Sequence, residues 1–214
     1  MDKWWKRPTR QATGSARRTG RPALETLDPA LLLRAYASGI FPMADARGRI
    51  RWYAPDPRAI IEHQNLRRSR SLRATIHKGV YEVRIDTAFE TVMRACADRP
   101  ETWINEAFVA AYTTLHAAGF AHSVEAWQGE TLVGGLYGVA IGGLFCGESM
   151  YSGATDASKV CLAGLVDRLI ARGYVLHDVQ FLTPHLVSLG ATTIPRADYE
   201  RRLAAAIRLP ISFV

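Results

Sequence analysis

The sequence predicts an α/β fold in which one mixed sheet carries helices on both faces. From about residue 80 onwards, the expected order is strand, helix, helix, three strands, helix, strand and helix. Short connections between the middle strands favour antiparallel hairpins, whereas a single helix between the last two strands requires those strands to be parallel. At 214 residues, 48% of them hydrophobic and 22% charged, the chain is long enough to bury a conventional core.

The residues before this sheet are expected to form a basic tail and a small aromatic-rich subdomain. The first 25 residues hold seven basic and two acidic side chains and no hydrophobic period, which predicts a flexible tail. After the tail, Asp28 is placed to cap a short helix that stops at Gly39, and Gly48 turns the chain between two extended runs. The expected regions are 1–25 (tail), 26–62 (subdomain) and 63–214 (main domain).

Hydrophobic periodicity places the elements of the main domain. Phe89, Val92, Met93 and Cys96 recur at helical spacing, for example, so we expect them to face the core. The expected helices are 65–78 (capped by Ser69 or Ser71), 86–97, 105–118, the helix from Thr155 or Asp156 to Gly173, and 198–206. The expected strands are 81–85, 122–128, 131–140, 143–150 and 174–180.

Composition excludes several classes of protein. The net charge is +7, but the tail accounts for +5 of it, which leaves only +2 for the remainder. The three cysteines and six histidines show neither a disulfide framework nor the spacing of metal ligands. The sequence has no stretch of 18 apolar residues, and its first residues carry charge without the apolar stretch that a secretory leader needs, so we expect no leader. We therefore expect a cytoplasmic protein with no metal and no membrane partner.

One candidate for chemistry is Glu148, where an apolar strand ends. A carboxylate that closes a buried strand needs a partner or a ligand, unless it turns outward to solvent, and the sequence favours neither alternative. A serine nucleophile in this segment is excluded, because Tyr151 stands where the turn around such a serine needs a second glycine.

A second candidate lies in the strand 174–180. Alternation along this strand places Asp178 and Gln180 on one face and His177 on the other. Asp178 would then orient the Gln180 amide, whose oxygen accepts a hydrogen bond from a substrate amine. The alternative, equally weighted, is a strand-end network that only holds the following loop.

A cluster of arginines in the first helix of the main domain is a candidate surface for nucleic acid. Such a cluster neutralises phosphates, although a solvated helix face has the same composition. The four residues are Arg67, Arg68, Arg70 and Arg73.

Nine short segments, taken together and in order, resemble one known family. They are residues 33–42, 52–58, 69–73, 102–104, 122–127, 134–138, 147–150, 156–159 and 183–186. The family is that of the leucyl/phenylalanyl-tRNA protein transferases, and the resemblance spans about residues 27–199.

The resemblance implies a reaction and its partners. The enzyme would be an aminoacyltransferase that moves Leu or Phe, with Met as a secondary donor, from aminoacyl-tRNA to proteins with amino-terminal Arg or Lys. This reaction serves N-end rule protein degradation and needs no cofactor, CoA or metal. The implied fold is a small amino-terminal domain followed by an acyl-CoA N-acyltransferase-like domain.

The resemblance also implies roles for particular residues. Asp178 and Gln180 match the pair that orients the attacking amine, and Glu148 matches an acidic residue at the acceptor site. The other substrate-binding residues are Trp103 and Tyr112 near the terminal adenosine of the tRNA, Tyr36 and Trp52 in the substrate cleft, and Leu136 and Phe145 in the wall of the amino-acid pocket.

Two alternatives come from other classes of protein. A CoA-dependent N-acetyltransferase would share the fold, but the pyrophosphate-binding loop typical of that class does not precede the helix at 155–172. A non-catalytic RNA-binding module would explain the basic tail without any role for Asp178 or Gln180.

Overall fold

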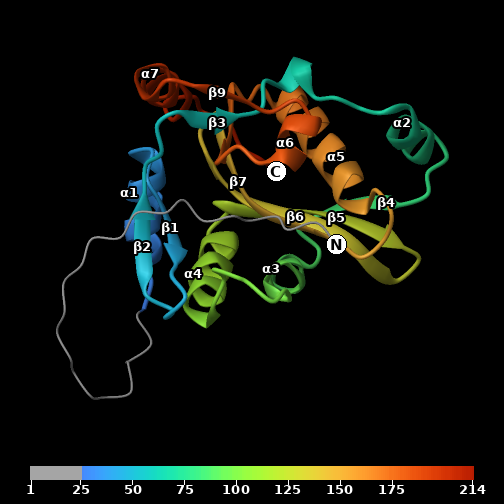
Figure 1. Cartoon of the computed structure of the whole chain (residues 1–214), viewed down its shortest axis with the longest axis horizontal. Coiled ribbons are helices and arrows are strands. Elements are labelled where there is room, and N and C mark those ends of the chain that lie inside the picture. The colour runs from blue at the N-terminus through green and yellow to red at the C-terminus, as the bar shows by residue number, and fades with distance from the viewer. Residues whose placement is uncertain (1–25) are drawn as a thin grey trace.

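The computed structural model describes residues 26–214, so the tail predicted for 1–25 lies outside the described residues. Its centre is a seven-stranded sheet in the order β4-β5-β6-β7-β8-β3-β9, in which only β7 and β8 run parallel (Figure 1). The predicted mixed sheet is therefore confirmed. The strands are β3 (Arg58–Ile60), β4 (Glu82–Ile85), β5 (Ala121–Gln128), β6 (Thr131–Ile141), β7 (Leu144–Ser152), β8 (Leu176–Gln180) and β9 (Thr192–Ile194).

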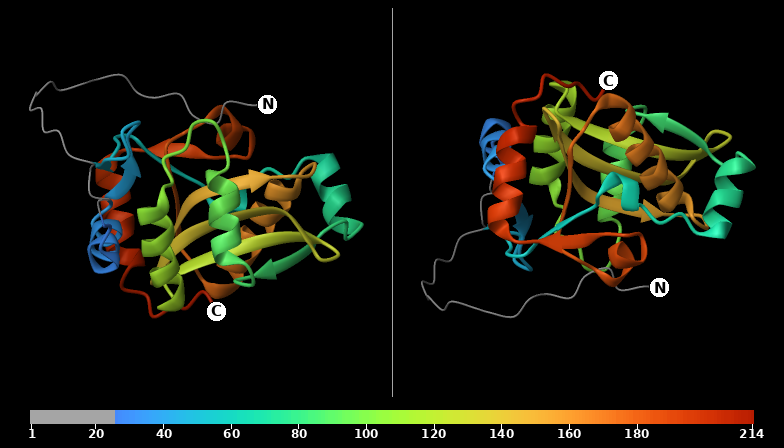
Figure 2. Two further views of the ribbon diagram at one scale, coloured as in Figure 1. Left: turned by 90° about the horizontal axis from the view of Figure 1, so that it is seen from below. Right: turned by 90° about the horizontal axis from the view of Figure 1, so that it is seen from above.

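Helices cover both faces of this sheet, as the sequence predicts (Figure 2). Helices α3 (Phe89–Ala97) and α4 (Glu106–Ala117) pack on one face, and α5 (Ala157–Arg172) packs on the other. The four residues expected on the inner side of α3 are all buried. One hydrophobic core therefore lies between the sheet and α3 and α4, and a second lies between the sheet and α5. The other helices of the main domain are α2 (Arg70–His77), α6 (Pro184–Ser188) and α7 (Arg196–Ala206).

The amino-terminal elements form a separate hairpin beside the main sheet. Helix α1 (Pro29–Ala37) begins where the Asp28 carboxylate accepts a hydrogen bond from the Ala30 N–H at 2.9 Å. Strands β1 (Phe41–Ala44) and β2 (Ile50–Tyr53) then pair antiparallel around the turn at Gly48. Strand β3 also falls within residues 26–62, but it lies in the main sheet between β8 and β9.

Glu125, within the segment 122–127, has a structural role. It is fully buried on β5, and its carboxylate accepts hydrogen bonds from the Ala88 N–H at 2.8 Å, Ser123 Oγ at 2.7 Å and Trp127 Nε1 at 3.0 Å. Ala88 directly precedes α3, and it has no side chain that could cap this helix. Glu125 therefore supplies the missing cap from the neighbouring strand and holds α3 against the sheet.

The structure corrects one predicted cap and adds short elements. Asp156 does stand at the start of α5, but its φ of 63° places it in the left-handed region, and its carboxylate pairs with Lys159 Nζ at 2.7 Å instead of capping the helix. Strands β3 and β9, helix α6 and a single 3₁₀ turn (His63–Asn65) were not predicted. None of the described helices is long and apolar enough to cross a membrane.

Candidate active site

The site forms where the two parallel strands stop pairing. Strands β7 and β8 pair only as far as Cys146 and Asp178, and a bulge just beyond leaves Glu148 outside the pairing with β6. At the end of β8, Gln180 donates from Nε2 to Glu148 Oε1 at 2.7 Å. The bulge needs a glycine at position 138, because a Cβ there would lie 2.3 Å from the Cys146 carbonyl oxygen. Two candidates from distant segments thus meet at one point.

Asp178 is the anchor of this site. Its side chain is completely buried, and Arg58 binds both carboxylate oxygens, with Nε at 2.9 Å and Nη2 at 2.6 Å. Tyr199 donates its hydroxyl at 2.7 Å, and the Gln180 N–H donates at 2.8 Å. Asp178 raises the pKa of Arg58 despite burial, and burial followed by the Asp178 charge raises the pKa of Tyr199. This carboxylate is saturated with donors, which suits an anchor better than a base.

The contact between Asp178 and Gln180 differs from the predicted one. Asp178 holds the backbone N–H of Gln180 rather than its side-chain amide. Gln180 has a φ of 67°, a left-handed conformation that non-glycine residues rarely adopt, and this turn directs its side chain to Glu148. Asp178 therefore orients the Gln180 amide indirectly, through the backbone.

Glu148 is the residue whose charge can change. Burial raises its pKa from 4.5 to about 8, although hydrogen bonds from Tyr36 and Gln180 oppose the rise. Tyr112 Oη also points to this carboxylate, at 3.5 Å, and bonds to the Tyr36 hydroxyl. The raised pKa favours the protonated form of this group, and a cation brought against it favours the carboxylate form.

The predicted aromatic residues fall into two groups. Tyr36 and Tyr112 are buried and turn their hydroxyls toward Glu148. Trp103 packs edge-on against Phe108, with ring centroids 5.2 Å apart, and so joins the same core. Trp52 stands apart on β2 with 40% of its surface exposed. The structure thus brings Tyr36 and Tyr112 to Glu148 and leaves Trp52 on the outside of the hairpin.

The two residues predicted to line an amino-acid pocket lie on the other face of the sheet. Leu136 and Phe145 are 3% and 0% exposed and belong to the core beneath α5. Tyr36 and Tyr112 belong to the core on the α3 and α4 side. Glu148 therefore stands between a core that holds its hydroxyl partners and a core that holds the predicted pocket residues.

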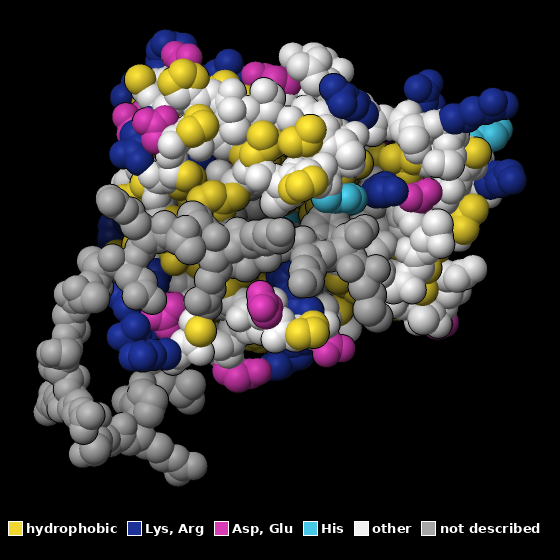
Figure 3. Space-filling view, viewed as in Figure 1, with side chains coloured by type: hydrophobic (Ala, Val, Ile, Leu, Met, Phe, Trp, Pro, Cys, Tyr) yellow, Lys and Arg dark blue, Asp and Glu magenta, His cyan; other side chains and the backbone are white. Residues whose placement is uncertain are grey.

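The arginine cluster lies at the start of α2 and just before it. Arg70 and Arg73 are on the helix, whereas Arg67 and Arg68 precede it, because the helix begins at Arg70 rather than at the predicted residue 65. Lys and Arg side chains gather around α2 in Figure 3. Arg67, Arg70 and Arg73 are exposed. Arg68 is different, because it forms an ion pair with Asp167 of α5 and so ties α2 to the domain. Three of the four predicted arginines are therefore free to meet a polyanion.

The fold also assembles a cluster that spacing did not reveal. Asp86, His116 and His122 place one potential metal-ligand atom each within 4.8 Å of the others. These atoms already have partners: His122 Nδ1 lies 2.7 Å from Asp86 Oδ2, and His116 Nδ1 lies 2.8 Å from the Ala121 carbonyl oxygen. A cation would have to replace these contacts, which at present hold the start of β5.

Comparison with known proteins places this geometry in a family. The leucyl/phenylalanyl-tRNA protein transferase family matches residues 60–204, and the amino-terminal domain of that family matches residues 25–56. The leucyl/phenylalanyl-tRNA–protein transferase of Rubrobacter xylanophilus is 56% identical over 188 residues, covering 87% of this chain and 98% of that protein. The relative from Herpetosiphon aurantiacus is 54% identical over 188 residues, with the same coverage of 87% and 98%. The relative from Gloeobacter violaceus is 50% identical over 191 residues, covering 89% of this chain and 99% of that protein. The chain therefore belongs to the leucyl/phenylalanyl-tRNA–protein transferase family.

Proposed function

We propose that this protein transfers Leu or Phe, and secondarily Met, from aminoacyl-tRNA to the α-amino group of proteins that begin with Arg or Lys. The observation that carries the proposal is the 2.7 Å contact between Gln180 and Glu148 at the point where β7 and β8 part. Such a product would mark proteins for N-end rule degradation in the cytoplasm.

The reaction asks for alignment more than for a strong base. The acceptor nitrogen attacks the ester carbonyl carbon, the new C–N bond forms, and the bond from that carbon to the ribose oxygen breaks. The proton lost by the amine is taken up by the departing ribose oxygen. Because the ester is already activated, holding the amine in line supplies much of the rate increase.

Gln180 is suited to hold that amine. Its Nε2 is committed to Glu148, which leaves the amide oxygen to accept an N–H from the acceptor. The bond from Asp178 to the Gln180 backbone fixes the direction of that oxygen. We therefore assign Gln180 to positioning the amine and Asp178 to positioning Gln180.

Glu148 is suited to recognise a cationic first residue in the acceptor. The guanidinium or ammonium group of Arg or Lys would stabilise the carboxylate form of Glu148 and lower its raised pKa. An acceptor with an apolar first residue would bring no cation to Glu148, so this carboxyl would stay in its protonated form. Selection of the acceptor thus rests on the charge state of Glu148.

The donor tRNA and its amino acid need further surfaces. Arg67, Arg70 and Arg73 are exposed and suited to phosphates of the tRNA body. For the donor side chain we retain Leu136 and Phe145, which belong to the apolar core beneath α5. An apolar pocket separates Leu, Phe and Met by small energies, so Met is expected to be a weaker donor rather than an excluded one.

Transfer of labelled leucine tests the proposal. The protein is incubated with radiolabelled Leu-tRNA and with two peptides that differ only in beginning with Arg or Ala. Label on the Arg peptide alone is the expected result. Binding of RNA without transfer would favour an RNA-binding module, and transfer from acetyl-CoA in its place would favour an N-acetyltransferase.

A further inference from the structure

Arg99 is an arginine whose hydrogen bonds are incomplete. It lies in the loop between α3 and α4, and its Nη2 donates to Ser149 Oγ on β7 at 3.0 Å. Its Nε is buried and finds no acceptor anywhere in residues 26–214. Within the same residues, no Asp or Glu oxygen lies within 4.0 Å of its guanidinium. A positively charged side chain is thus held in place but left without a counter-ion.

Among residues 26–214, Arg99 is the only arginine with a buried side-chain N–H that lacks an acceptor. Arg58 binds both oxygens of Asp178, and the exposed Arg94 binds two glutamates. A buried N–H of a charged group without an acceptor is unfavourable, and an ordered water or a bound anion can supply the acceptor. Arg99 is therefore distinguished by its surroundings rather than by its residue type.

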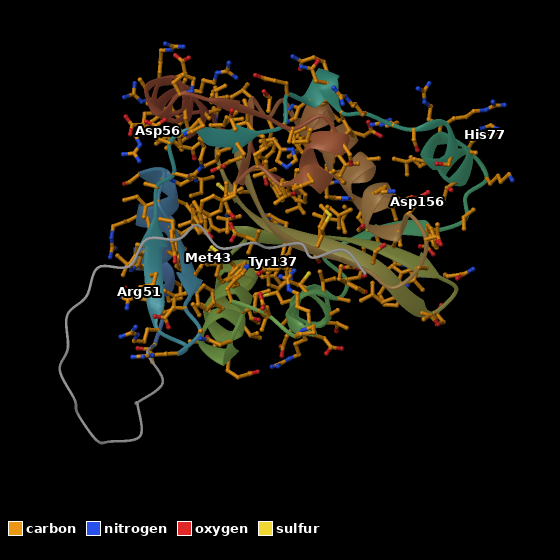
Figure 4. All side chains as sticks on the ribbon, viewed as in Figure 1. Met43, Arg51, Asp56, His77, Tyr137 and Asp156 are labelled. Atoms are coloured by element: carbon orange, nitrogen blue, oxygen red, sulfur yellow. The ribbon has the colours of Figure 1, made fainter. Side chains whose placement is uncertain are left out.

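A second donor without a partner lies on β6, opposite the serine that Arg99 contacts. The Tyr137 hydroxyl is fully buried and also finds no partner in the described residues. Tyr137 pairs with Ser149 across β6 and β7, and the Arg99 charge acts on its hydroxyl. Its position between the sheet and α4 is marked in Figure 4, and its ring packs on Tyr112 at 5.9 Å. Two unfilled donors thus converge on the same strand pair.

The chemistry of this group selects an anion with several oxygens. The guanidinium offers five N–H donors and has no acceptor atom, and among the described residues only Ser149 accepts a hydrogen bond from it. Burial raises the pKa of Tyr137 well above 10, so this hydroxyl stays a donor. The planar fork of an arginine matches the paired oxygens of a phosphate.

We propose that Arg99, with Ser149 and Tyr137, binds the phosphodiester that precedes the terminal nucleotide of the donor tRNA. The inference rests on the proposed function, because it takes the substrate to be an aminoacyl-tRNA. Ser149 directly follows Glu148, so a ribose ester placed for reaction at Glu148 and Gln180 brings its own 5′ phosphate to this side of the site. Arg99 then fixes the end of the RNA, while the exposed arginines at and before the start of α2 bind its body.

Binding of a modified RNA tests the proposal. The probe is an uncharged acceptor-stem minihelix that ends in CCA, made with either the natural phosphodiester or an uncharged methylphosphonate before the last adenosine. Affinities are measured by fluorescence anisotropy at fixed salt for the intact protein and for Arg99→Gln. Arg94→Gln is the matched control, because it removes an arginine from the end of α3 that already has carboxylate partners.

We expect the intact protein and Arg94→Gln to bind the neutral-linkage RNA about tenfold more weakly than the natural RNA. Arg99→Gln should lose about tenfold on the natural RNA and should no longer distinguish the two. If Arg99→Gln does not fold, as judged by thermal unfolding, Arg99→Lys replaces it and should keep part of the discrimination, because it keeps the charge.

Three results would overturn the assignment. The first is that the intact protein binds both RNAs equally well. The second is that Arg99→Gln still distinguishes the two RNAs as the intact protein does. The third is that Arg99→Gln keeps its affinity for RNA and loses only turnover. The last would place Arg99 at the reacting carbonyl instead. Transfer of labelled Leu by the intact protein is measured in parallel: transfer without an Arg99 effect refutes the phosphate site alone, and absence of transfer refutes the proposed function.

Discussion

Replacement of Glu148 by Gln should stabilise the protein, and increasingly so as the pH rises. The pKa of Glu148 is raised in the folded state to about 8 from 4.5, so the folded protein binds a proton more tightly than the unfolded chain does. The free energy of unfolding of the wild type therefore falls as the pH increases from about 4.5 to about 8, and levels off above that value. Glutamine has no proton to lose and avoids this fall.

The size of the effect follows from the pKa. At about 1.4 kcal/mol per pKa unit, a rise from 4.5 to about 8 sets an upper bound of about 5 kcal/mol. Because the Glu148 side chain is only half-buried and keeps hydrogen bonds from Gln180 and from tyrosine hydroxyls, we expect about 2 to 3 kcal/mol in practice.

Urea unfolding at pH 5, 7 and 9 measures this difference. Glu148→Gln and the wild type should be closest at pH 5, and the variant should be the more stable by the expected amount at pH 9. Glu130→Gln is the control, because that side chain is 94% exposed, and its difference from the wild type should stay flat. A Glu148→Gln difference that is flat, or that shrinks toward pH 9, would refute the argument that burial governs this carboxyl.

Three further expectations concern activity. Tyr199→Phe removes one donor from Asp178 and should lower turnover about tenfold with little change in the KM for tRNA. Tyr174→Phe is the control, because it removes a hydroxyl that has no partner among the described residues, and it should leave turnover unchanged. Equal losses of turnover in steady-state assays would argue against a specific role for Tyr199. Neutralising Arg70 and Arg73 together should weaken tRNA binding and reduce the slope of log K against log salt concentration by the amount expected for about two phosphate contacts. An unchanged slope would mean that these arginines only face solvent. Leu136→Ala should lower the free energy of unfolding by about 3 kcal/mol. If Leu136 contacts the donor side chain, the same change should alter the ratio of Phe transfer to Leu transfer. An unchanged ratio in competition assays would exclude Leu136 from the pocket.

The sequence predicts those elements whose causes are local. The cap at Asp28 and the apolar period of α3 act within a few residues, and both are found where expected. Strands β3 and β9 have only three residues each, too few to show a period. They form through distant pairing, because β3 pairs with β8 and β9 then pairs with β3. The turn at Asp156 depends on Lys159, which a capping pattern does not include.

The candidate site divides in the same way. The faces of Asp178 and Gln180 follow from strand alternation. The left-handed conformation of Gln180, which leaves its backbone N–H on Asp178 and turns its side chain to Glu148, does not follow from it. Arg58 lies 120 positions before Asp178, and Tyr199 lies 21 after it, so no local pattern joins them. The one available signal is an arginine directly before the apolar run 59–61, where a charge needs a buried partner.

The position of Arg58 has a consequence for how the molecule holds together. Its Nη1 donates to the Gly39 carbonyl at 2.9 Å, and its guanidinium lies over the rings of Phe41 and Tyr199 while it grips Asp178. A fragment that starts at residue 63 would lose this cation and leave the buried Asp178 carboxylate with neutral donors but no counter-charge, at a cost of about 3 to 5 kcal/mol. The hairpin and the sheet should therefore melt in a single cooperative transition, and neither is expected to be expressed as an independent folding unit.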